Sequence, residues 1–338
     1  IYSIAYIIAP LFLCIIRVNG GDYDKMKNGD VLLSNYVLEE VHAARDRGVY
    51  VVGVPTCYVD SEWTPRGYIQ PNPNDWLMGD VTNDILQSYI PYQQGLVDCP
   101  EVPEMRICPS AANALNSIFW MFQAEVANKL RDGKAKPVDK SVIYLDTVLD
   151  RIQEAYSRQK EYIFDHAPTV AKMIGRGGHY HVTSDHGSVA NEATGTAMGP
   201  MMTNAFRGDM KKGDVHLLAT IEPDSEKIVT EAKKAREMGM FVVSIAPANS
   251  VMLRRYSDVF IDNLSPEGGG FFEIKGFAEK VAVAGSILNN WLMWIFTAQF
   301  IDEMVRRGWV PWFYINGHVI GAGDYNTAMK PFFLGQGF

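Results

Sequence analysis

Residues 210–246 constrain the fold more than any other stretch, because they carry the pattern of a complete strand–helix–strand unit. A turn leads into a short apolar strand at 215–219, and Ser225 is a suitable N-cap for the helix that follows. The helix ends at Gly239, and a second, continuously apolar strand covers 241–246. Two such strands predict a parallel sheet covered on both faces, with a ligand crevice at the carboxyl ends of the strands. The residues at helical spacing between the strands are Ile228, Ala232 and Ala235.

The same pattern occurs earlier in the chain. In both copies a Gly-Asp turn precedes an apolar strand, a helix follows, and a second apolar strand begins after a glycine. A long apolar helix then closes each half of the sequence. Because order and spacing both hold, we interpret the chain as an internal duplication. The matching segments are 26–33 with 210–217, 48–54 with 239–245, and the closing helices 111–130 with 281–307.

The composition is that of a globular protein with about two domains. The chain has 338 residues, of which 47% are hydrophobic and 21% charged, so each half can bury an ordinary core. The net charge of −8 disfavours nucleic acid or an anionic membrane as partner, since both reward a concentrated basic surface. The four cysteines form no Cys-x-x-Cys pair, so the sequence indicates neither a zinc site nor a disulfide framework, and we expect a reducing cytoplasm.

Residues 1–16 form the most apolar run of the sequence. Pro10 interrupts this run, no basic segment precedes it, and it is shorter than the roughly 20 residues that span a bilayer. We therefore expect a strand at 1–5 and a buried helix near 6–18. A signal peptide or a membrane anchor is the alternative.

Three regions outside the repeated units have their own patterns. Residues 55–110 contain eight prolines and are typical of a long irregular insertion, with one helix near 81–89. Apolar residues at three- and four-residue spacing predict a helix at 142–160, followed by a short helix that ends before Gly175. The C-terminal segment 309–338 is too aromatic for a solvated tail, and we expect it to pack against the body or against another subunit.

The strands and loops of the second half carry an ordered set of short motifs. They are HVTSDHGS at 181–188, KGDV at 212–215, GMFVVSI at 239–245, SDVFIDN at 257–263 and AGSILN at 284–289. As an ordered set they resemble the sugar isomerase (SIS) domain family, which comprises phosphosugar isomerases and phosphosugar-binding proteins. The resemblance extends over nearly the whole chain, with two such domains in tandem.

The resemblance implies an α/β fold of two tandem SIS-type domains with three αβα layers, each with a parallel sheet of about five strands. Residues 1–133 would form the first domain, which is degenerate and carries the 55–110 insertion. Residues 134–338 would form the second domain, with leading helices and the aromatic tail. In the first half the loop at 35–38 is about seven residues shorter than its counterpart and lacks a hydroxyl cluster, so we expect no phosphate site there.

The resemblance also implies where a sugar phosphate binds in the second domain. Backbone amides and hydroxyls at the strand ends would hold the phosphate, since a turn entering a helix offers unpaired N–H groups to an anion. Glu192 lies one turn into a helix, where related isomerases place a carboxylate base, and His186 on the turn is suited to shuttle protons. Glu222 and Asp224 depart from the family pattern, because they would repel a phosphate. The predicted substrate-binding residues are Ser184, Gly187, Ser188, Thr220 and Ser225.

The catalytic assignments have alternatives. Glu192 could instead be a surface residue favoured near the positive end of a helix. Glu267 and Glu273 flank a glycine-rich loop and are alternative bases. His318 in the aromatic tail could reach the site from a partner chain.

His179 and His181 alternate along a predicted strand, so both face the same side. No cysteine or further carboxylate stands at ligand spacing from them in the sequence, and we interpret them as structural. The glycine-rich segment 175–178 precedes a strand instead of following one, so it is not a dinucleotide-binding fingerprint. The sequence therefore predicts no metal and no cofactor.

These observations favour a sugar-phosphate (aldose–ketose) isomerase that acts in the second domain on a small-molecule sugar phosphate. A non-catalytic phosphosugar-binding or regulatory protein is the first alternative, which the acidic loop at 222–224 favours. A structural assembly subunit is the second, which the insertion and the aromatic tail favour. We expect a cytoplasmic homo-oligomer, a dimer or tetramer, with neither nucleic acid nor membrane as partner.

Overall fold

The computed structural model describes most of the chain, and the elements below belong to that part. The strand expected at 1–5 and the helix expected near 6–18 lie outside it, as do His186 and Gly187. Within the described ranges, no helix has both the length and the apolar character needed to cross a membrane. The structure describes residues 23–35, 37–55, 76–91, 94–131, 139–185, 188–205, 210–266, 270–273, 280–317 and 319–338.

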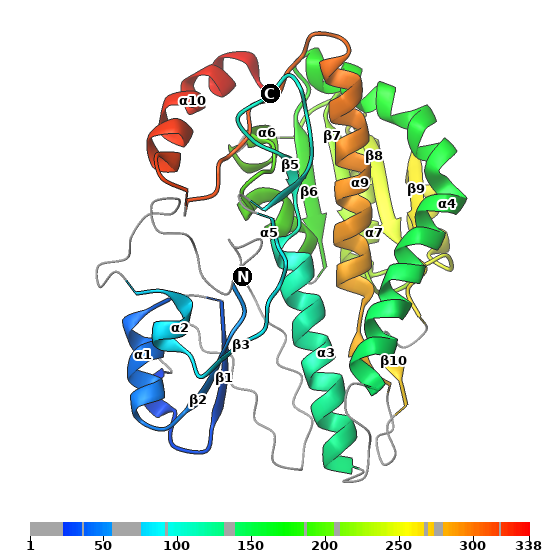
Figure 1. Cartoon of the computed structure of the whole chain (residues 1–338). Helices are drawn as coiled ribbons and strands as arrows, with labels where there is room; N and C mark the ends of the chain where they lie inside the picture. Colours follow the sequence, from blue (N-terminus) through cyan, green and yellow to red (C-terminus); the bar gives the residue numbers. More distant parts are fainter. Residues whose placement is uncertain are drawn as a thin grey trace.

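The centre of the molecule is a four-stranded parallel sheet (Figure 1). In order across the sheet, its strands are β6 (Tyr180–Ser184), β7 (Val215–Ala219), β8 (Phe241–Ala246) and β9 (Val259–Asp262). Helix α7 (Glu226–Glu237) covers one face, and helices α4 (Asp139–Gly175) and α9 (Gly285–Val305) cover the other. The second half therefore has the expected three αβα layers, with four strands in the described part where about five were expected.

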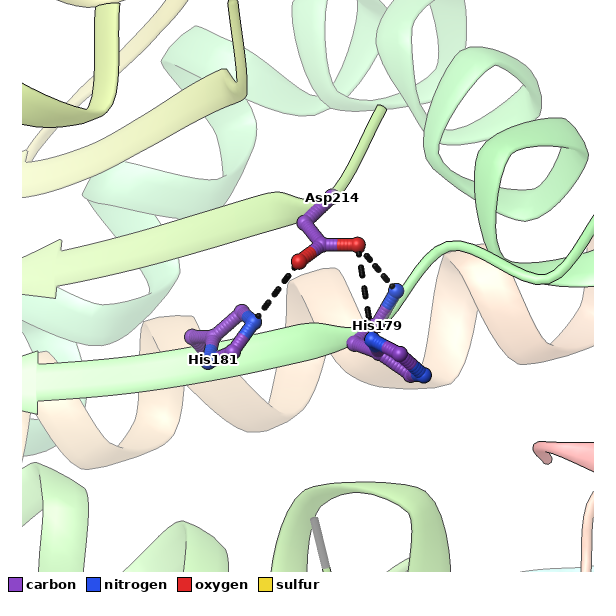
Figure 2. Close-up of side chains that lie close together, drawn as sticks. All are labelled: His179, His181 and Asp214. Carbon is purple, nitrogen blue, oxygen red and sulfur yellow. Dashed lines mark hydrogen bonds and ion pairs between the residues drawn. The ribbon is translucent and has the colours of Figure 1, made fainter. Parts of the chain in front are cut away.

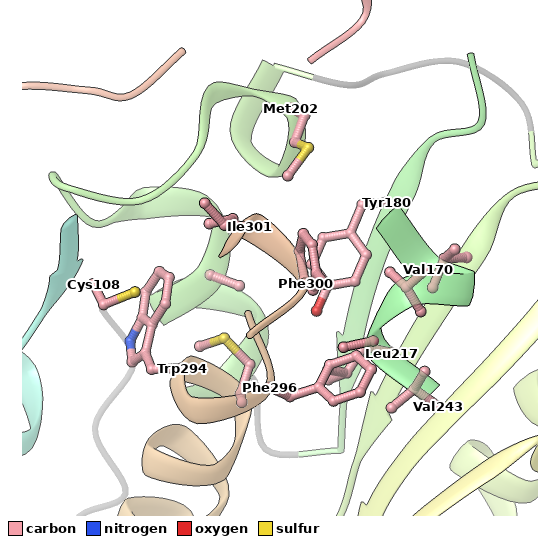
Figure 3. Close-up of a cluster of buried hydrophobic side chains, with 14 of the residues drawn as sticks. Cys108, Val170, Tyr180, Met202, Leu217, Val243, Trp294, Phe296, Phe300 and Ile301 are labelled. Atoms are coloured by element: carbon pink, nitrogen blue, oxygen red, sulfur yellow. The ribbon is translucent and has the colours of Figure 1, made fainter. Parts of the chain in front are cut away.

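The main hydrophobic core lies between this sheet and the helices α4 and α9 (Figure 3). The ring centroids of Tyr180 on β6 and Phe300 on α9 are 5.1 Å apart, and those of Phe296 and Phe300 are 6.0 Å apart. All three side chains are buried, so α9 is fixed against the edge strand of the sheet by aromatic packing. The sheet and α4 complete this layer with Leu217, Val243 and Val170.

A second, smaller parallel sheet belongs to the first half of the chain. Its strands, in order, are β1 (Val31–Ser34), β2 (Tyr50–Gly53) and β3 (Asp84–Ile85). The helices α1 (Glu39–Asp46) and α2 (Met78–Val81) and the 3₁₀ turn η1 (Tyr23–Lys25) accompany it. In Figure 1 this blue unit lies to one side of the larger sheet. It has its own core, made of Met26, Leu32, Val41, Ala44, Val49, Val51, Met78 and Val81.

The two strand–helix–strand units begin with the same turn. The Lys27 N–H donates to Asp30 Oδ2 at 2.9 Å, and the Lys211 N–H donates to Asp214 Oδ2 at 3.0 Å. The glycine before each aspartate has a positive φ, of 94° and 92°, which a residue with a side chain rarely adopts. The Gly-Asp pattern in the sequence therefore marks one turn used twice.

The strands that follow these turns pair in equivalent register. Val31 of β1 lies opposite Tyr50 of β2, and Val215 of β7 lies opposite Phe241 of β8. This equivalence supports duplication of the unit, while the division into tandem domains at 1–133 and 134–338 stays a prediction. In both units a side chain before the third strand accepts a backbone N–H: Asn83 Oδ1 from Val51 at 2.8 Å, and Asp258 Oδ2 from Val242 at 2.8 Å.

The expectation of an irregular insertion at 55–110, with one helix near 81–89, is wrong for the described part. Helix α2 lies earlier, and β3 completes the small sheet, because Asn83 bonds to the neighbouring strand instead of continuing a helix. The segment ends in an antiparallel hairpin of β4 (Gly95–Val97) and β5 (Ile107–Pro109). This hairpin packs on α9, and the Cys108 N–H donates to the Met198 carbonyl at 3.1 Å.

One long helix, α4, replaces the two helices expected at 142–160 and before Gly175. Pro168 lies inside it and removes one helical hydrogen bond. Its neighbours Ala167, Val170 and Ala171 are fully buried, so packing on the sheet offsets that loss. The closing helix of the first half, α3 (Ala111–Arg131), packs against α4 and α9.

The remaining elements surround the larger sheet. Residues 281–283, expected in the closing helix, instead form β11 (Val281–Val283), which pairs with β10 (Gly270–Phe272). The aromatic tail packs on the body, as one of the two expectations had it. Phe313 is buried and bridges to Pro200, and α10 (Ala322–Gln336) lies beside α6 (Met201–Ala205). The short helices α5 (Ser188–Gly195) and α8 (Val251–Arg255) follow β6 and β8.

The end of α4 is closely packed, and this yields a test of the fold. A methyl group added at Gly175 would overlap the indole of Trp309. We expect Gly175→Ala to lower the free energy of unfolding by about 2 kcal/mol, the usual cost of overpacking. Gly335→Ala is the matched control, since no atom lies within 4 Å of the added carbon and the helical glycine is replaced by a better helix former. Urea unfolding measures the free energy of unfolding of both variants, and equal stabilities would contradict the packing described here.

Candidate functional site

Buried polar side chains gather at the carboxyl edge of the larger sheet, meaning the ends of β6 and β7. Ser184, Thr220, Asn263 and Asn289 are all buried there. The Thr220 carbonyl accepts hydrogen bonds from Asn263 Nδ2 at 3.2 Å and from Asn289 Nδ2 at 3.0 Å. Asn263 Nδ2 also donates to Asn289 Oδ1 at 2.7 Å. This network ties the loop after β7 to β9 and α9 and fixes its shape.

The two predicted anion contacts Ser184 and Thr220 have protein partners. The Thr220 hydroxyl donates to the Asp185 carboxylate and accepts the Glu222 N–H at 2.9 Å. Ser184 Oγ accepts the Ala190 N–H at 3.3 Å, in the first turn of α5. Both hydroxyls therefore stabilise the loops that follow their strands. The two residues lie at the same edge of the sheet, as the sequence pattern predicts.

A lysine that the sequence analysis did not select also lies at this edge. Lys227 Nζ donates to the Ser184 carbonyl at 3.2 Å, and the side chain is exposed. It stands in the first turn of α7, whose N-cap residue Ser225 makes no side-chain capping bond. The first N–H groups of α7 and the Lys227 ammonium group therefore both lie at the carboxyl edge. The available signal was a lysine two residues after the predicted N-cap.

One of the acidic residues expected to repel a phosphate is engaged elsewhere. Asp224 Oδ1 accepts the Leu253 N–H at 2.9 Å, so this carboxylate serves the start of α8. Asp224 also has a positive φ of 49°, a conformation that aspartate tolerates better than most residues. Glu222 is exposed beside the carboxyl edge. Asp185 is held by Thr220 and lies at the edge itself.

Glu192, the predicted base, is buried inside the protein. It is 4% exposed, so the alternative of a surface residue is wrong. Trp294 Nε1 donates to its Oε1 at 3.0 Å, and Thr196 Oγ1 donates to its Oε2 at 2.9 Å. Burial raises the pKa of this carboxyl above its ordinary value, although the two donors oppose the rise. The carboxyl is held between α5 and α9.

Glu192 therefore predicts a pH dependence of stability. Below its ordinary pKa of 4.5 the carboxyl is protonated in both states, and above that value it ionises first in the unfolded chain. The unfolded state is then favoured, so stability falls as pH rises from 4.5 toward the raised pKa of the folded state. The difference in melting temperature between Glu192→Gln and wild type should therefore grow in favour of the variant as pH rises. Exposed Glu237→Gln is the control, and a pH-independent difference for Glu192→Gln would contradict this account.

The remaining predicted site residues lie at the margins of the described part of the structure or outside it. Helix α5 begins at Ser188, but the structure does not describe the side chain of this residue. Glu273, an alternative base, is exposed after β10. Outside the described residues lie His186, Gly187, Glu267 and His318.

A second polar cluster occupies the amino edge of the same two strands (Figure 2). His179 and His181 face the same side, as predicted, and their ring centroids are 6.4 Å apart. The fully buried Asp214, which directly precedes the neighbouring strand β7, lies between them. The carboxylate that the sequence analysis found lacking therefore comes from a position 33 and 35 residues further along the chain. Strand register, not sequence spacing, brings it there.

Comparison with known sequences gives partial matches. No family model matches the chain. UPF0309 proteins of Brucella canis and Brucella suis are each 26% identical over 151 residues, which is 42% of this chain. The UPF0309 protein of Brucella anthropi is 24% identical over the same length. The match spans 62% of the length of these relatives.

Comparison with solved structures gives phosphosugar isomerases among the similar proteins. A phosphoheptose isomerase from Francisella tularensis is 15% identical, with a TM-score of 0.38, over 51% of this chain and 100% of that one. A Methanococcus jannaschii protein, with an inferred function of 3-hexulose-6-phosphate isomerase, is 14% identical with a TM-score of 0.31 (48% and 90% covered). An E. coli protein in complex with A5P is 14% identical with a TM-score of 0.31 (51% and 94% covered).

Proposed function

We propose that this chain binds a sugar phosphate at the carboxyl edge of β6 and β7, as its resemblance to SIS proteins implies. One observation carries the proposal: the Lys227 ammonium group reaches the Ser184 carbonyl beside the first turn of α7, where Ser225 leaves the helix without a side-chain cap. A helix N-terminus and a cation at the end of parallel strands form a suitable site for a phosphate.

The remaining groups at this edge suit the sugar. The carboxylates of Asp185 and Glu222 accept hydrogen bonds from hydroxyl groups, and a sugar supplies several of these. In the proposed mode the phosphate lies on the N–H groups of α7 and on Lys227, and the sugar hydroxyls lie toward Asp185. The acidic side chains then act as sugar contacts instead of opposing the phosphate.

Lys227→Gln tests this mode of binding. A thermal-shift screen of hexose, pentose, heptose and amino-sugar phosphates, with the unphosphorylated sugars beside them, first identifies the ligand. Loss of a charge-assisted bond of about 1.5–3 kcal/mol should then weaken its binding by roughly ten- to hundredfold. The matched control is Lys233→Gln on the same helix, whose side chain is 58% exposed in an ion pair with Glu237. If the two variants bind the sugar phosphate equally well, the proposed phosphate site is wrong.

Aldose–ketose isomerisation is the second candidate, and Glu192 is the observation that favours it. A buried carboxyl with a raised pKa, one turn into the helix after Ser184, is the kind of group that transfers protons at functional sites. In this reaction a base removes the proton from the carbon beside the carbonyl to give an enediol, the proton is returned to the former carbonyl carbon, and a proton moves from the neighbouring hydroxyl oxygen to the former carbonyl oxygen. His186 is the proposed proton shuttle.

Deuterium exchange separates the two candidates. An isomerase incubated with its sugar phosphate in D2O should incorporate deuterium at the carbon next to the carbonyl. Glu192→Gln should retain ligand binding and lose the exchange. If wild type binds the sugar phosphate without exchange, the chain is a binding protein and the isomerase candidate fails.

A further inference from the structure

The amino edge of β6 and β7 holds three side chains with the atoms that bind transition metals (Figure 2). His181 Nε2 lies 3.1 Å from Asp214 Oδ2, and His179 Nδ1 lies 3.5 Å from Asp214 Oδ1. The three groups offer one ligand atom each, and these atoms all lie within 4.8 Å of one another. His179 directly precedes β6, His181 lies in β6, and Asp214 directly precedes β7, the strand that pairs with β6.

These separations suit a four-coordinate divalent ion. Zinc binds imidazole nitrogen at about 2.0–2.1 Å and carboxylate oxygen at about 2.0–2.2 Å, so neighbouring ligand atoms of a tetrahedral site are roughly 3.3 Å apart. His181 Nε2 lies 3.1 Å from Oδ2 and His179 Nδ1 lies 3.5 Å from Oδ1, so each imidazole is near this distance from one of the two carboxylate oxygens, and one ligand atom from each of the three residues lies within 4.8 Å of the others.

The carboxylate is oriented before any ion arrives. Asp214 is fully buried. Its Oδ1 accepts the backbone N–H of His179 at 2.9 Å, and its Oδ2 accepts the backbone N–H of Lys211 at 3.0 Å. Outer hydrogen bonds of this kind hold a metal-binding carboxylate in place. Burial also lowers the pKa of both His179 and His181, which favours the neutral imidazole that binds metals.

Solvent reaches the cluster from the edge of the sheet. Strand β6 is the outermost of the four strands in the described part of this sheet, and the His179 and His181 side chains are 27% and 9% exposed. An ion can therefore enter beside His179, and a water molecule can take the fourth position.

We propose that His179, His181 and Asp214 bind a divalent transition metal ion, with Zn²⁺ as the best fit to two imidazoles and one carboxylate. The site lies at the opposite end of β6 and β7 from the proposed sugar-phosphate site. Its ion acts as a structural clamp that joins the starts of the two strands. It is therefore independent of the proposed function.

Titration of the full chain with Co²⁺ and Zn²⁺, after removal of metals by EDTA, tests this site. Wild type should bind one more equivalent of Zn²⁺ than His179→Ala, or bind it at least tenfold more tightly. Tetrahedral Co²⁺ should give visible absorption bands in wild type that are absent from His179→Ala. His166→Ala on α4 is the matched control, because this histidine is also partly exposed and lies outside the cluster, and the variant should behave as wild type.

Melting temperatures measured with and without Zn²⁺ separate a metal site from a cluster that only forms hydrogen bonds. Zn²⁺ should raise the melting temperature of wild type and of His166→Ala, and leave that of His179→Ala unchanged. Because His179 is partly exposed, its truncation should leave the apo fold intact, which circular dichroism checks. Asp214→Asn, which keeps one acceptor oxygen, should also lose the Zn²⁺ effect. If wild type and His179→Ala bind Zn²⁺ alike, or wild type binds none, the cluster is only a hydrogen-bonded turn and the proposal is overturned.

Discussion

Phe300→Ala is expected to lower the free energy of unfolding by about 4 kcal/mol, the usual cost of truncating a buried phenylalanine. Phe300 is fully buried on α9 and contacts Tyr180 of the edge strand and Phe296 of its own helix (Figure 3). Removing its ring leaves a cavity between α9 and the sheet, which the surrounding rings fill only in part. Urea unfolding followed by circular dichroism measures the loss.

Phe332→Ala is the matched control for this prediction. Phe332 is 56% exposed on α10, and its ring centroid lies 5.6 Å from that of Trp312. Its loss should cost about 1 kcal/mol or less. Similar costs for the two variants would show that α9 does not form the core described here.

Asn263→Ala is expected to cost about 3 kcal/mol, because it leaves buried polar groups without partners. Asn263 donates to the Thr220 carbonyl and to Asn289, and its Oδ1 accepts the Ser265 N–H at 2.9 Å. Alanine makes none of these bonds, and water has no access to a fully buried position. The same variant should weaken sugar-phosphate binding, because the loop after β7 loses part of its support.

Asn249→Ala is the control for the network. Asn249 is exposed in the loop between β8 and α8, so its substitution should change stability by less than about 0.5 kcal/mol. Urea unfolding compares the two variants. A cost below 1 kcal/mol for Asn263→Ala would show that the buried network does not support the carboxyl edge.

The repeated unit could be predicted from sequence because its signals are local. Gly-Asp turns, continuous apolar strands and one amphipathic helix each occupy a few neighbouring residues, and the structure places them with equivalent strand register. Helix boundaries that depend on tertiary packing were harder to predict from the sequence. The sequence predicts a helix at 142–160 and a second one before Gly175, yet α4 is continuous and runs through Pro168, because Ala167 and Val170 are buried on the sheet. Tertiary packing overrides propensity there.

In the candidate sites too, residues with local signals could be predicted, and residues that depend on contacts between strands could not. Ser184 and Thr220 follow neighbouring strands, and parallel pairing brings them to one edge, as the pattern predicted. Lys227 and Asp214 were missed because their roles depend on contacts across strands. Asp214 stands 33 residues from His181, and only the register of β6 against β7 brings the two together. Sequence spacing alone carries no such information.

Amide chemical-shift mapping tests the central claim most directly. The sugar phosphate with the largest effect in the thermal-shift screen is titrated into ¹⁵N-labelled full chain, and the amide signals are followed by TROSY spectroscopy. The proposed site predicts the largest shifts at residues 184–185 and in the first turn of α7, with Lys227 among them. Shifts confined to the surface cleft between Glu101 and the Trp309–Phe313 segment, or no shifts with any sugar phosphate, would contradict it.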